Sequence, residues 1–359
     1  MLKKIVLTGA AGALGSRLRA PLAAMCETLV STDLAAALDG VADNETYVKA
    51  DVGNAEEMMA LIEGAEMVVH FGAIADEAPF EQIMHSNFMG AYNVWNAAHK
   101  HGVRRIVYAS SIHAMGMYPK TTRITGDMPH RPDSFYGLSK CFAEDMGRMY
   151  WDKYGIEAVC LRIYSAPGSV ANARALGSYL SYDDCVQLVQ RSVDTPVVGF
   201  TVIYGVSNND RSPVDNSAAA FLGYRPKDNA EEFAEAILAK TPKADPLDKA
   251  QMCHGGPFAT VPLGVSGVQY IKKMSEGTDP RPAIAPACGN AGIPGARARD
   301  SRRHGAPCRA ARRGRGPGGP APRRARAGPR AADPRHRSCR TCRRSRRARI
   351  RPFSPAKSA

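Results

Sequence analysis

Tyr136 and Lys140 are the residues of this chain whose types and spacing most directly indicate catalysis. Residues four positions apart on a helix lie on the same face. A lysine ammonium next to a tyrosine phenol stabilises the phenolate and so lowers the phenol pKa. We therefore expect Tyr136 to act as a base near neutral pH, with Lys140 as its partner. Ser111 ends a predicted strand 25 residues earlier, where its hydroxyl can hold the reacting oxygen.

A glycine-rich turn at Gly9, Gly12 and Gly15 is the second chemical signal. It follows a predicted strand and opens a predicted helix, with Ala13 and Leu14 in the same turn. A pyrophosphate binds to backbone N–H groups at a helix N-terminus, and only glycine lets the chain come close enough. The turn therefore predicts a dinucleotide site, with an ordinary turn of small residues as the alternative.

A carboxylate at the end of the second predicted strand indicates which dinucleotide binds. Asp33 comes 18 residues after Gly15, where a carboxylate can accept hydrogen bonds from the ribose hydroxyls. Its charge would also repel the 2′-phosphate of NADP. We therefore predict NAD as the cofactor; the alternative is that Asp33 only belongs to the turn after the strand.

Short apolar runs alternate with amphipathic segments, and these elements must position the chemical groups. Buried strands are predicted at 5–8, 28–32, 67–71, 106–110 and 158–163. Helices are predicted at 13–24, 55–63, 80–101 and 134–154. Asn54 is the expected N-cap of the second helix, and Gly102 and Gly155 fit the ends of the third and fourth. The alternation indicates βαβ units and a parallel sheet.

We predict an α/β fold, a Rossmann-type doubly wound parallel sheet with a small C-terminal substrate lobe and a disordered basic tail. The dehydrogenase domain is expected at 1–265. The lobe occupies about 165–265 of it and includes a strand near 197–204. A linker at 266–280 and the tail at 281–359 follow.

The formal net charge of +14 is unevenly distributed along the chain. Residues 281–359 hold 23 of the 48 Lys and Arg residues but only 2 of the 34 Asp and Glu residues, which leaves residues 1–280 with a net charge of −7. An acidic body argues against a nucleic-acid groove there. The tail, rich in Arg, Pro, Ala and Gly, buries too little apolar area to offset its ordering entropy, so we expect it to be disordered and without function. Nucleic-acid binding by the tail alone is the alternative.

Cysteine usage and apolar run lengths indicate where the protein resides. Five widely spaced cysteines lie in the acidic body and do not form a disulfide pattern. No run reaches the length of about 18 apolar residues that a membrane span needs. We expect a cytoplasmic protein that does not enter a membrane. No metal site is predicted, because the pair Cys339 and Cys342 has no second ligand pair at finger spacing.

These motifs resemble the extended branch of the short-chain dehydrogenase/reductase superfamily. Further segments look like uronate dehydrogenase, and this likeness runs from Lys3 to about Val261. The segments that carry it are His70-Phe71-Gly72-Ala73-Ile74, Ala109-Ser110-Ser111-Ile112-His113, Tyr136–Cys141-Phe142 and Pro226-Lys227-Asp228-Asn229-Ala230-Glu231. The resemblance implies NAD-dependent oxidation of the anomeric carbon of D-glucuronate or D-galacturonate to an aldarolactone.

The resemblance also implies roles for residues that spacing alone does not assign. Asp51 and Val52 would bracket the adenine, and the turn at Phe71, Gly72 and Ala73 would run beneath the ribose. The residues that would contact the sugar or its carboxylate are Ser111, His113, Ser165 and Arg174. Arginine suits a carboxylate because it can donate two parallel hydrogen bonds. Paired helices in this superfamily make a homo-oligomer possible.

Three positions depart from the uronate dehydrogenase pattern. Ile112 stands where the family has asparagine, Ala75 where it has serine, and Tyr164 where it has glycine. Each lost hydrogen bond to the sugar would weaken binding by about 0.5–1.5 kcal/mol. A nucleotide-sugar epimerase, or an extended dehydrogenase acting on another sugar, therefore remains the alternative. A non-catalytic dinucleotide sensor is disfavoured, because the Tyr-Lys pair is intact.

Overall fold

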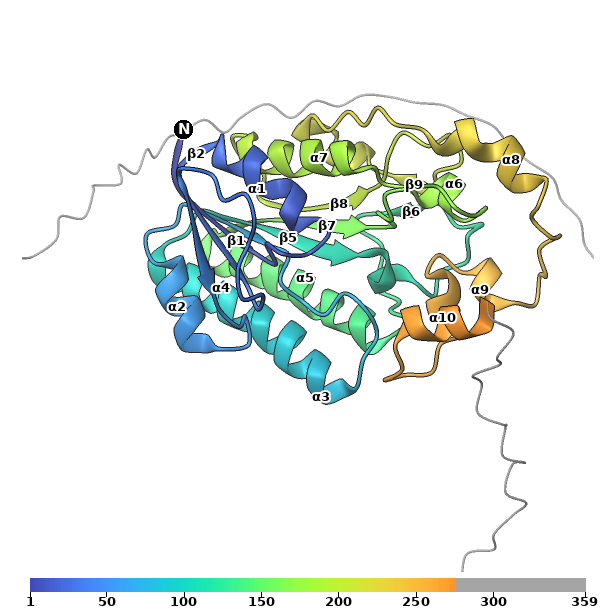
Figure 1. Ribbon diagram of the computed structural model, residues 1–359, viewed down its shortest axis with the longest axis horizontal. Coiled ribbons are helices and arrows are strands. Elements are labelled where there is room, and N and C mark those ends of the chain that lie inside the picture. The colour runs from blue at the N-terminus through green and yellow to red at the C-terminus, as the bar shows by residue number, and fades with distance from the viewer. Residues whose placement is uncertain (276–359) are drawn as a thin grey trace, which may run out of the picture. The chain divides into compact units, whose positions relative to one another are not determined.

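Seven parallel strands form the main sheet of the computed structural model, which describes residues 1–275 (Figure 1). The strand order is β3-β2-β1-β4-β5-β7-β8, and every neighbouring pair is parallel. The strands are β1 (Leu2–Thr8), β2 (Cys26–Asp33), β3 (Glu45–Lys49), β4 (Met67–His70), β5 (Arg105–Ser111), β7 (Glu157–Ile163) and β8 (Phe200–Gly205). The order reverses between β1 and β4, which creates the crevice where such sheets bind ligands. The predicted Rossmann-type doubly wound fold is confirmed.

Helices cover both faces of this sheet (Figure 1). One face carries α1 (Gly15–Ala23) and α7 (Tyr182–Asp194), which contact each other. The opposite face carries α2 (Ala55–Ile62), α4 (Gly90–His101) and α5 (Phe135–Tyr154). Parallel strands enclosed in this way are buried on both sides, which explains why their sequences are continuous apolar runs.

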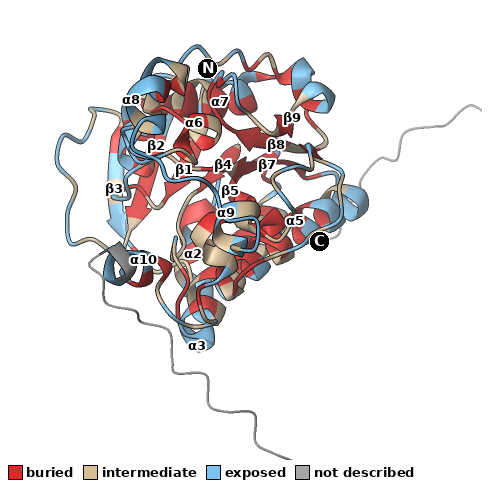
Figure 2. Ribbon diagram, turned by 90° about the vertical axis from the view of Figure 1, so that its right-hand side faces the viewer, coloured by how far each residue is buried: buried red, intermediate tan, exposed pale blue. Residues whose placement is uncertain are grey.

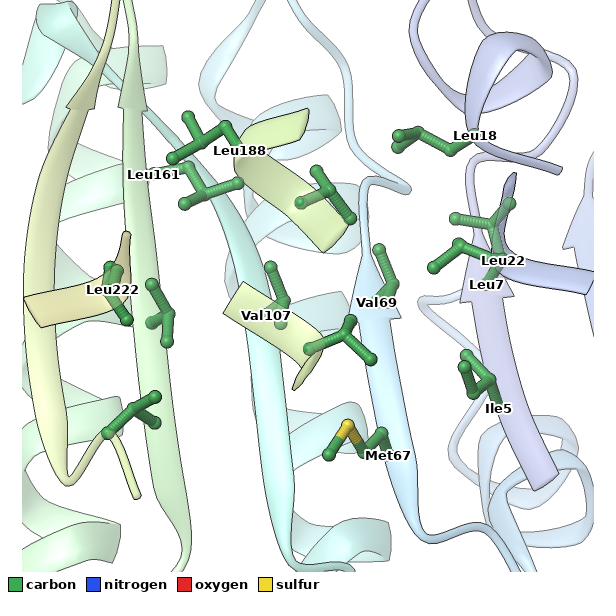
Figure 3. Close-up of a cluster of buried hydrophobic side chains, with 14 of the residues drawn as sticks. Ile5, Leu7, Leu18, Leu22, Met67, Val69, Val107, Leu161, Leu188 and Leu222 are labelled. Atoms are coloured by element: carbon green, nitrogen blue, oxygen red, sulfur yellow. The ribbon is translucent and has the colours of Figure 1, made fainter. Parts of the chain in front are cut away.

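The core consists mainly of two apolar layers, one on each face of the sheet. Figure 2 shows the strands as mostly buried. The layer beneath α1 and α7 joins Leu18 and Leu22 to strand residues such as Val69 and Val107 (Figure 3). The opposite layer packs Trp95 of α4, which is fully buried, against the other side of the sheet. Together the layers hold the carboxyl ends of the strands in fixed relative positions.

The helix ends follow the expected capping chemistry. The Asn54 side chain accepts hydrogen bonds from the N–H groups of Glu56 and Glu57, as an N-cap should. Gly102 and Gly155 end α4 and α5 in the left-handed conformation, with φ of 66° and 73°. The helix expected at 80–101 begins as α3 (Phe80–Ile83), widens into a π-helical turn at Met84–Met89 and continues as α4.

The segment after β7 contributes to two parts of the fold. The strand expected near 197–204 is β8, which pairs with β7 in the main sheet instead of lying in a separate lobe. In the same segment β9 (Val214–Asp215) pairs with β6 (Ile124–Thr125), which precedes β7 in the chain, and short helices form at α6 (Ala175–Ser178), α8 (Ala234–Leu238) and α9 (Lys249–Met252). The boundaries of the predicted lobe stay a prediction.

Helix α10 (Gly267–Ser275) occupies the region for which a linker is predicted. The Asp76 carboxylate accepts hydrogen bonds from the Ser266 hydroxyl and the Gly267 N–H. Ser266 Oγ in turn accepts from the N–H of Gln269 at 3.1 Å. A serine followed three residues later by glutamine is a helix-start signal that the sequence contained.

The predicted disordered tail at 281–359, with the Cys339 and Cys342 pair, lies outside the described residues. Within residues 1–275, no helix combines the length and the apolar character needed to cross a membrane. The five cysteines of this part are free and buried.

Candidate active site

A cavity of about 650 Å³ lies at the carboxyl ends of the strands and joins the predicted cofactor residues to the predicted catalytic ones. The predicted cofactor residues that line it are Gly9, Gly12, Ala13, Leu14, Gly15, Asp33, Asp51, Val52, Phe71, Gly72, Ala73 and Lys140. Ser111, His113 and Tyr136 line the same cavity. The ends of β2 and β5, the loops after β1, β3 and β4, and the helices α1 and α5 therefore converge on one place.

The glycine turn is packed so closely that side chains are excluded. Gly9 has φ of +75°, and a Cβ there would lie 2.6 Å from the Phe71 carbonyl carbon. A Cβ on Gly15, the first residue of α1, would lie 1.9 Å from Gly9 O. The turn thus brings bare backbone to the positive end of a nine-residue helix, an arrangement that fits a pyrophosphate.

Asp33 is fixed at the end of β2 by backbone donors. Its Oδ2 accepts from the N–H of Ala11 at 2.9 Å, and its Oδ1 accepts from the N–H of Leu34 at 2.7 Å. The carboxylate therefore links the strand end to the glycine turn and lines the cavity. A fixed negative charge at this point fits the ribose hydroxyls of NAD and opposes a 2′-phosphate.

Asp51 and Val52 hold the next part of the cavity wall. Asp51 Oδ2 lies 2.9 Å from His85 Nε2, a contact that sequence reasoning missed because His85 is 34 residues away. Val52 fits between two glycines: a Cβ on Gly72 would lie 2.9 Å from Val52 Cγ1, and one on Gly90 2.8 Å from Val52 Cγ2. These contacts make the wall rigid next to the turn at Phe71.

Tyr136 and Lys140 lie one turn apart on α5, beside Ser111 at the end of β5. The Tyr136 phenol forms a hydrogen bond with the Ser111 side chain. Lys140 Nζ lies 5.3 Å from the centroid of the Tyr136 ring and donates to Ala109 O at 2.8 Å. Ser134 is the N-cap of helix α5, and its hydroxyl accepts from the N–H of Gly137. The expected Ser-Tyr-Lys set is thus assembled in space.

The protonation of this set differs from the sequence-based expectation. Burial raises the pKa of Tyr136 to about 12, although the Ser111 hydrogen bond acts in the lowering direction. Burial also lowers the pKa of Lys140 to about 7, against the opposing effect of Glu144. We expected the phenol pKa to be lowered, and burial instead leaves the pKa of Tyr136 above its usual value. Removal from water disfavours the charged form of each group, the phenolate and the ammonium alike.

A buried ionic cluster lies behind the catalytic helix. Glu144 accepts from the Ser110 hydroxyl at 2.5 Å and from Arg162 Nη2 at 2.7 Å, and it lies 2.9 Å from His130 Nε2. Burial acts to raise the pKa of Glu144, but Arg162 and these hydrogen bonds hold it at about 2. The cluster ties α5 to β5 and β7 and so supports the positions of Ser111 and Lys140.

Ser165 and Arg174 contact each other but do not line the main cavity. Arg174 Nη1 donates to Ser165 Oγ at 2.8 Å, and Nη2 donates to His254 O at 3.0 Å. Its Nε–H is buried and has no hydrogen-bond partner within residues 1–275. Arg174 also forms no ion pair with a side chain of this part of the chain. The Arg174 charge is therefore not balanced by a carboxylate of this part of the chain, and its Nε–H is left as a free donor.

The three departures from the uronate dehydrogenase pattern occupy different environments. Ala75 and Tyr164 line the main cavity, whereas Ile112 is fully buried in an apolar cluster with Met115 and Tyr204. Tyr164 lies in that cluster too, and its hydroxyl is 2.8 Å from His254 Nδ1. Ile112 therefore affects the core behind the site, and Tyr164 and Ala75 affect the wall of the site.

A C-terminal loop completes the site, and sequence reasoning missed it. A Cβ on Gly256, where φ is +63°, would lie 2.6 Å from Arg174 Nε, and the Phe258 ring lies 4.1 Å from the His113 ring between centroids. The backbone N–H of His254 donates to Tyr118 O, which holds the loop in place. In the sequence, only the glycines of this loop indicate that another segment packs closely here, and the segment itself could not be predicted.

A parallel sheet with this turn and a Tyr-x-x-x-Lys helix defines an extended short-chain dehydrogenase/reductase. Residues 5–179 match the sequence model of the NAD dependent epimerase/dehydratase family. Uronate dehydrogenase of Pseudomonas putida is 43% identical over 257 residues, covering 71% of this chain and 95% of that protein. By these matches the chain belongs to the uronate dehydrogenase family.

Solved structures agree with this assignment. A mutant of uronate dehydrogenase from Agrobacterium tumefaciens, complexed with NAD, is 44% identical and superposes with a TM-score of 0.69 over 73% of this chain and 98% of that one. Glucuronic acid dehydrogenase from Chromohalobacter salexigens is 38% identical, with a TM-score of 0.70 over 73% and 98% of the two chains. The protein is an NAD-dependent oxidoreductase that acts on a CH–OH group.

Proposed function

We propose that this enzyme oxidises the anomeric carbon of a hexuronate, D-glucuronate or D-galacturonate, to an aldarolactone. The observation that carries the proposal is the assembly of Ser111, Tyr136 and Lys140 in the same cavity as the residues that fit NAD. The relatives named above support a uronate as the substrate. Arg174, whose Nε–H has no hydrogen-bond partner among the described residues, supports a carboxylate on that substrate.

Each side chain has a distinct part in the reaction. The Ser111 hydroxyl holds the anomeric oxygen, and the Tyr136 phenolate removes the proton from it. Lys140, anchored on Ala109 O, orients the nicotinamide ribose. NAD, when bound, accepts the hydride from C1, and the positive charge of its ring favours the phenolate. Arg174 and Ser165 hold the carboxylate end of the sugar.

Replacement of Tyr136 by phenylalanine tests the role of the base. The Tyr136→Phe variant should lose NADH formation by at least about a hundredfold, because general base catalysis contributes about 10²–10⁴. Its affinity for NAD, measured by titration calorimetry, should match that of the native enzyme. A variant that keeps most of its turnover would contradict the assignment.

A substrate panel separates uronate oxidation from the alternatives. Glucuronate, galacturonate, the matching neutral aldoses and a nucleotide sugar are each offered with NAD or NADP. Net NADH release with free uronates supports the proposal. Turnover of the nucleotide sugar without net NADH would identify an epimerase instead, and preference for neutral aldoses would show that Arg174 holds no carboxylate.

A further inference from the structure

Asp133 is a buried carboxylate next to the candidate active site. Its side chain is 0% exposed. Its Oδ2 lies 2.8 Å from His113 Nδ1, and its Oδ1 accepts from the Ser134 hydroxyl at 2.8 Å. A carboxylate without exposure to water requires partners of this kind for both oxygens.

Three glycines pack closely around the contact between Asp133 and His113. A Cβ on Gly116 or on Gly255 would lie 1.8 Å from Asp133 Oδ2. A Cβ on Gly137 would lie 2.3 Å from His113 O and 3.2 Å from Asp133 Oδ1. The three glycines belong to the loop after β5, to helix α5 and to the C-terminal loop. Separate parts of the chain therefore close around the contact between Asp133 and His113.

The His113 ring is held in one orientation inside the cavity. It packs against the ring of Phe258, with 4.1 Å between centroids, and meets the Tyr136 ring edge-on at 5.7 Å. Nε2 of His113 forms no hydrogen bond within residues 1–275, although the residue lines the cavity. This nitrogen is the polar atom that the ring offers to a bound molecule.

We propose that Asp133 is a positioning residue that fixes the tautomer of His113, so that Nε2 accepts a hydrogen bond from a substrate hydroxyl. A carboxylate can only accept, so it keeps the proton on Nδ1 and leaves the lone pair on Nε2. The inference rests on the proposed sugar substrate, whose ring hydroxyls next to C1 are donors of this kind. It assigns the enzyme a preference for substrates that bear a hydroxyl within reach of Nε2.

The hydrogen bonds of Ser134 determine which way an asparagine at position 133 would be oriented. The Ser134 oxygen accepts from the N–H of Gly137 at 2.9 Å, and its hydrogen is donated to Asp133 Oδ1, because a carboxylate can only accept. In an Asp133→Asn variant the amide oxygen must receive that hydrogen, and the amide NH₂ then faces His113 Nδ1. The imidazole must accept there and carry its proton on Nε2. The substitution thus reverses the tautomer with almost no change in shape.

The tautomer is read directly by ¹⁵N NMR of the histidine rings in the free enzyme at neutral pH, with the His113 signals assigned through a His113→Gln variant. We expect Nδ1–H in the native enzyme and Nε2–H in Asp133→Asn. Steady-state kinetics of Asp133→Asn should show KM for the sugar raised about tenfold to a hundredfold, with a smaller change in kcat, because the lost contact is present before the reaction.

Two comparisons make the outcome decisive. Ser134→Ala disturbs the same helix start but leaves the carboxylate, so it should keep the native tautomer and KM. An Nε2–H or doubly protonated His113 in the native enzyme would overturn the inference even if the variants do not fold. So would a reversed tautomer with unchanged KM. Because the tautomer is measured without substrate, a failure of the proposed uronate reaction would leave that result intact and separable.

Discussion

Burial sets the protonation of the two central residues of the candidate site. Tyr136 and Lys140 are 8% and 3% exposed, and loss of solvent acts on them in opposite directions. It moves the pKa of the phenol up to about 12 and that of the amine down to about 7. Both groups are thereby shifted toward their neutral forms, so the phenolate requires additional positive charge or a high pH.

The pH dependence of the reaction follows from the Tyr136 pKa. As long as the pH is below the Tyr136 pKa, the phenolate fraction increases about tenfold with each unit by which the pH rises. We therefore expect kcat/KM to increase with pH from 6 upward, since the active form is the deprotonated one. Initial rates of NADH formation at low sugar concentration measure this. A profile that falls over this range would contradict Tyr136 as the base.

The charge of Asp33 is predicted to exclude NADP. In an Asp33→Asn variant the carboxamide oxygen can still accept one backbone hydrogen bond, but the negative charge is gone. The ratio of kcat/KM for NAD to that for NADP should fall about tenfold, because two charges a few ångströms apart near a surface interact by more than 1 kcal/mol. Glu27→Gln on the same strand, exposed and outside the cavity, is the matched control. An unchanged ratio would show that Asp33 does not select the cofactor.

At the scale of elements, the site depends on the joint between α5, β5 and β7. Glu144 of α5 bonds to Ser110 of β5 and to Arg162 of β7. Because a one-residue shift of α5 would break these bonds, the cluster fixes the register of the helix that carries Tyr136 and Lys140. Ion pairs enclosed in this way hold a geometry, and they are costly to leave half complete.

Removal of the Glu144 charge should destabilise the fold. A Glu144→Gln variant leaves Arg162 buried without its partner, which costs about 3–5 kcal/mol. Urea unfolding at pH 7 measures the difference. Asp152→Asn on the same helix removes an exposed pair with Arg148 and should change stability by no more than about 0.5 kcal/mol.

The lowered pKa of Glu144 predicts how the free energy of unfolding changes at low pH. Its pKa is about 2 in the folded protein, below the ordinary value of 4.5. A carboxyl group whose pKa is lowered by folding stabilises the fold at every pH above its pKa in the unfolded chain. That contribution is lost as the pH falls from 4.5 toward 2. The gap between native protein and Glu144→Gln should therefore shrink over this range. A gap that stays constant would show that the Glu144 charge is not its source.

At the scale of the whole molecule, local patterns predicted the sheet and the cofactor half of the site, and distant contacts escaped prediction. The glycine turn, Asp33 and the Tyr136–Lys140 helix are each readable within a short window of sequence. Phe258 and Gly256 meet His113 and Arg174 across more than eighty residues. Burial of Tyr136 likewise depends on the complete fold, and for that reason the sequence did not predict that the pKa of Tyr136 is raised.

Truncation separates the folded enzyme from its basic tail. A chain ending at residue 280 retains the α10 contacts to Asp76 and loses 23 of the 48 basic residues. We expect unchanged kcat/KM and Tm, with loss of any salt-sensitive retention on DNA. A chain ending at residue 260 also loses the bond from Gly264 N–H to Glu77, whose other oxygen accepts from Tyr136 N–H. Its activity and Tm should fall. If the chain ending at residue 280 already had a lowered kcat/KM, the tail would have a part in the enzyme that its composition does not predict.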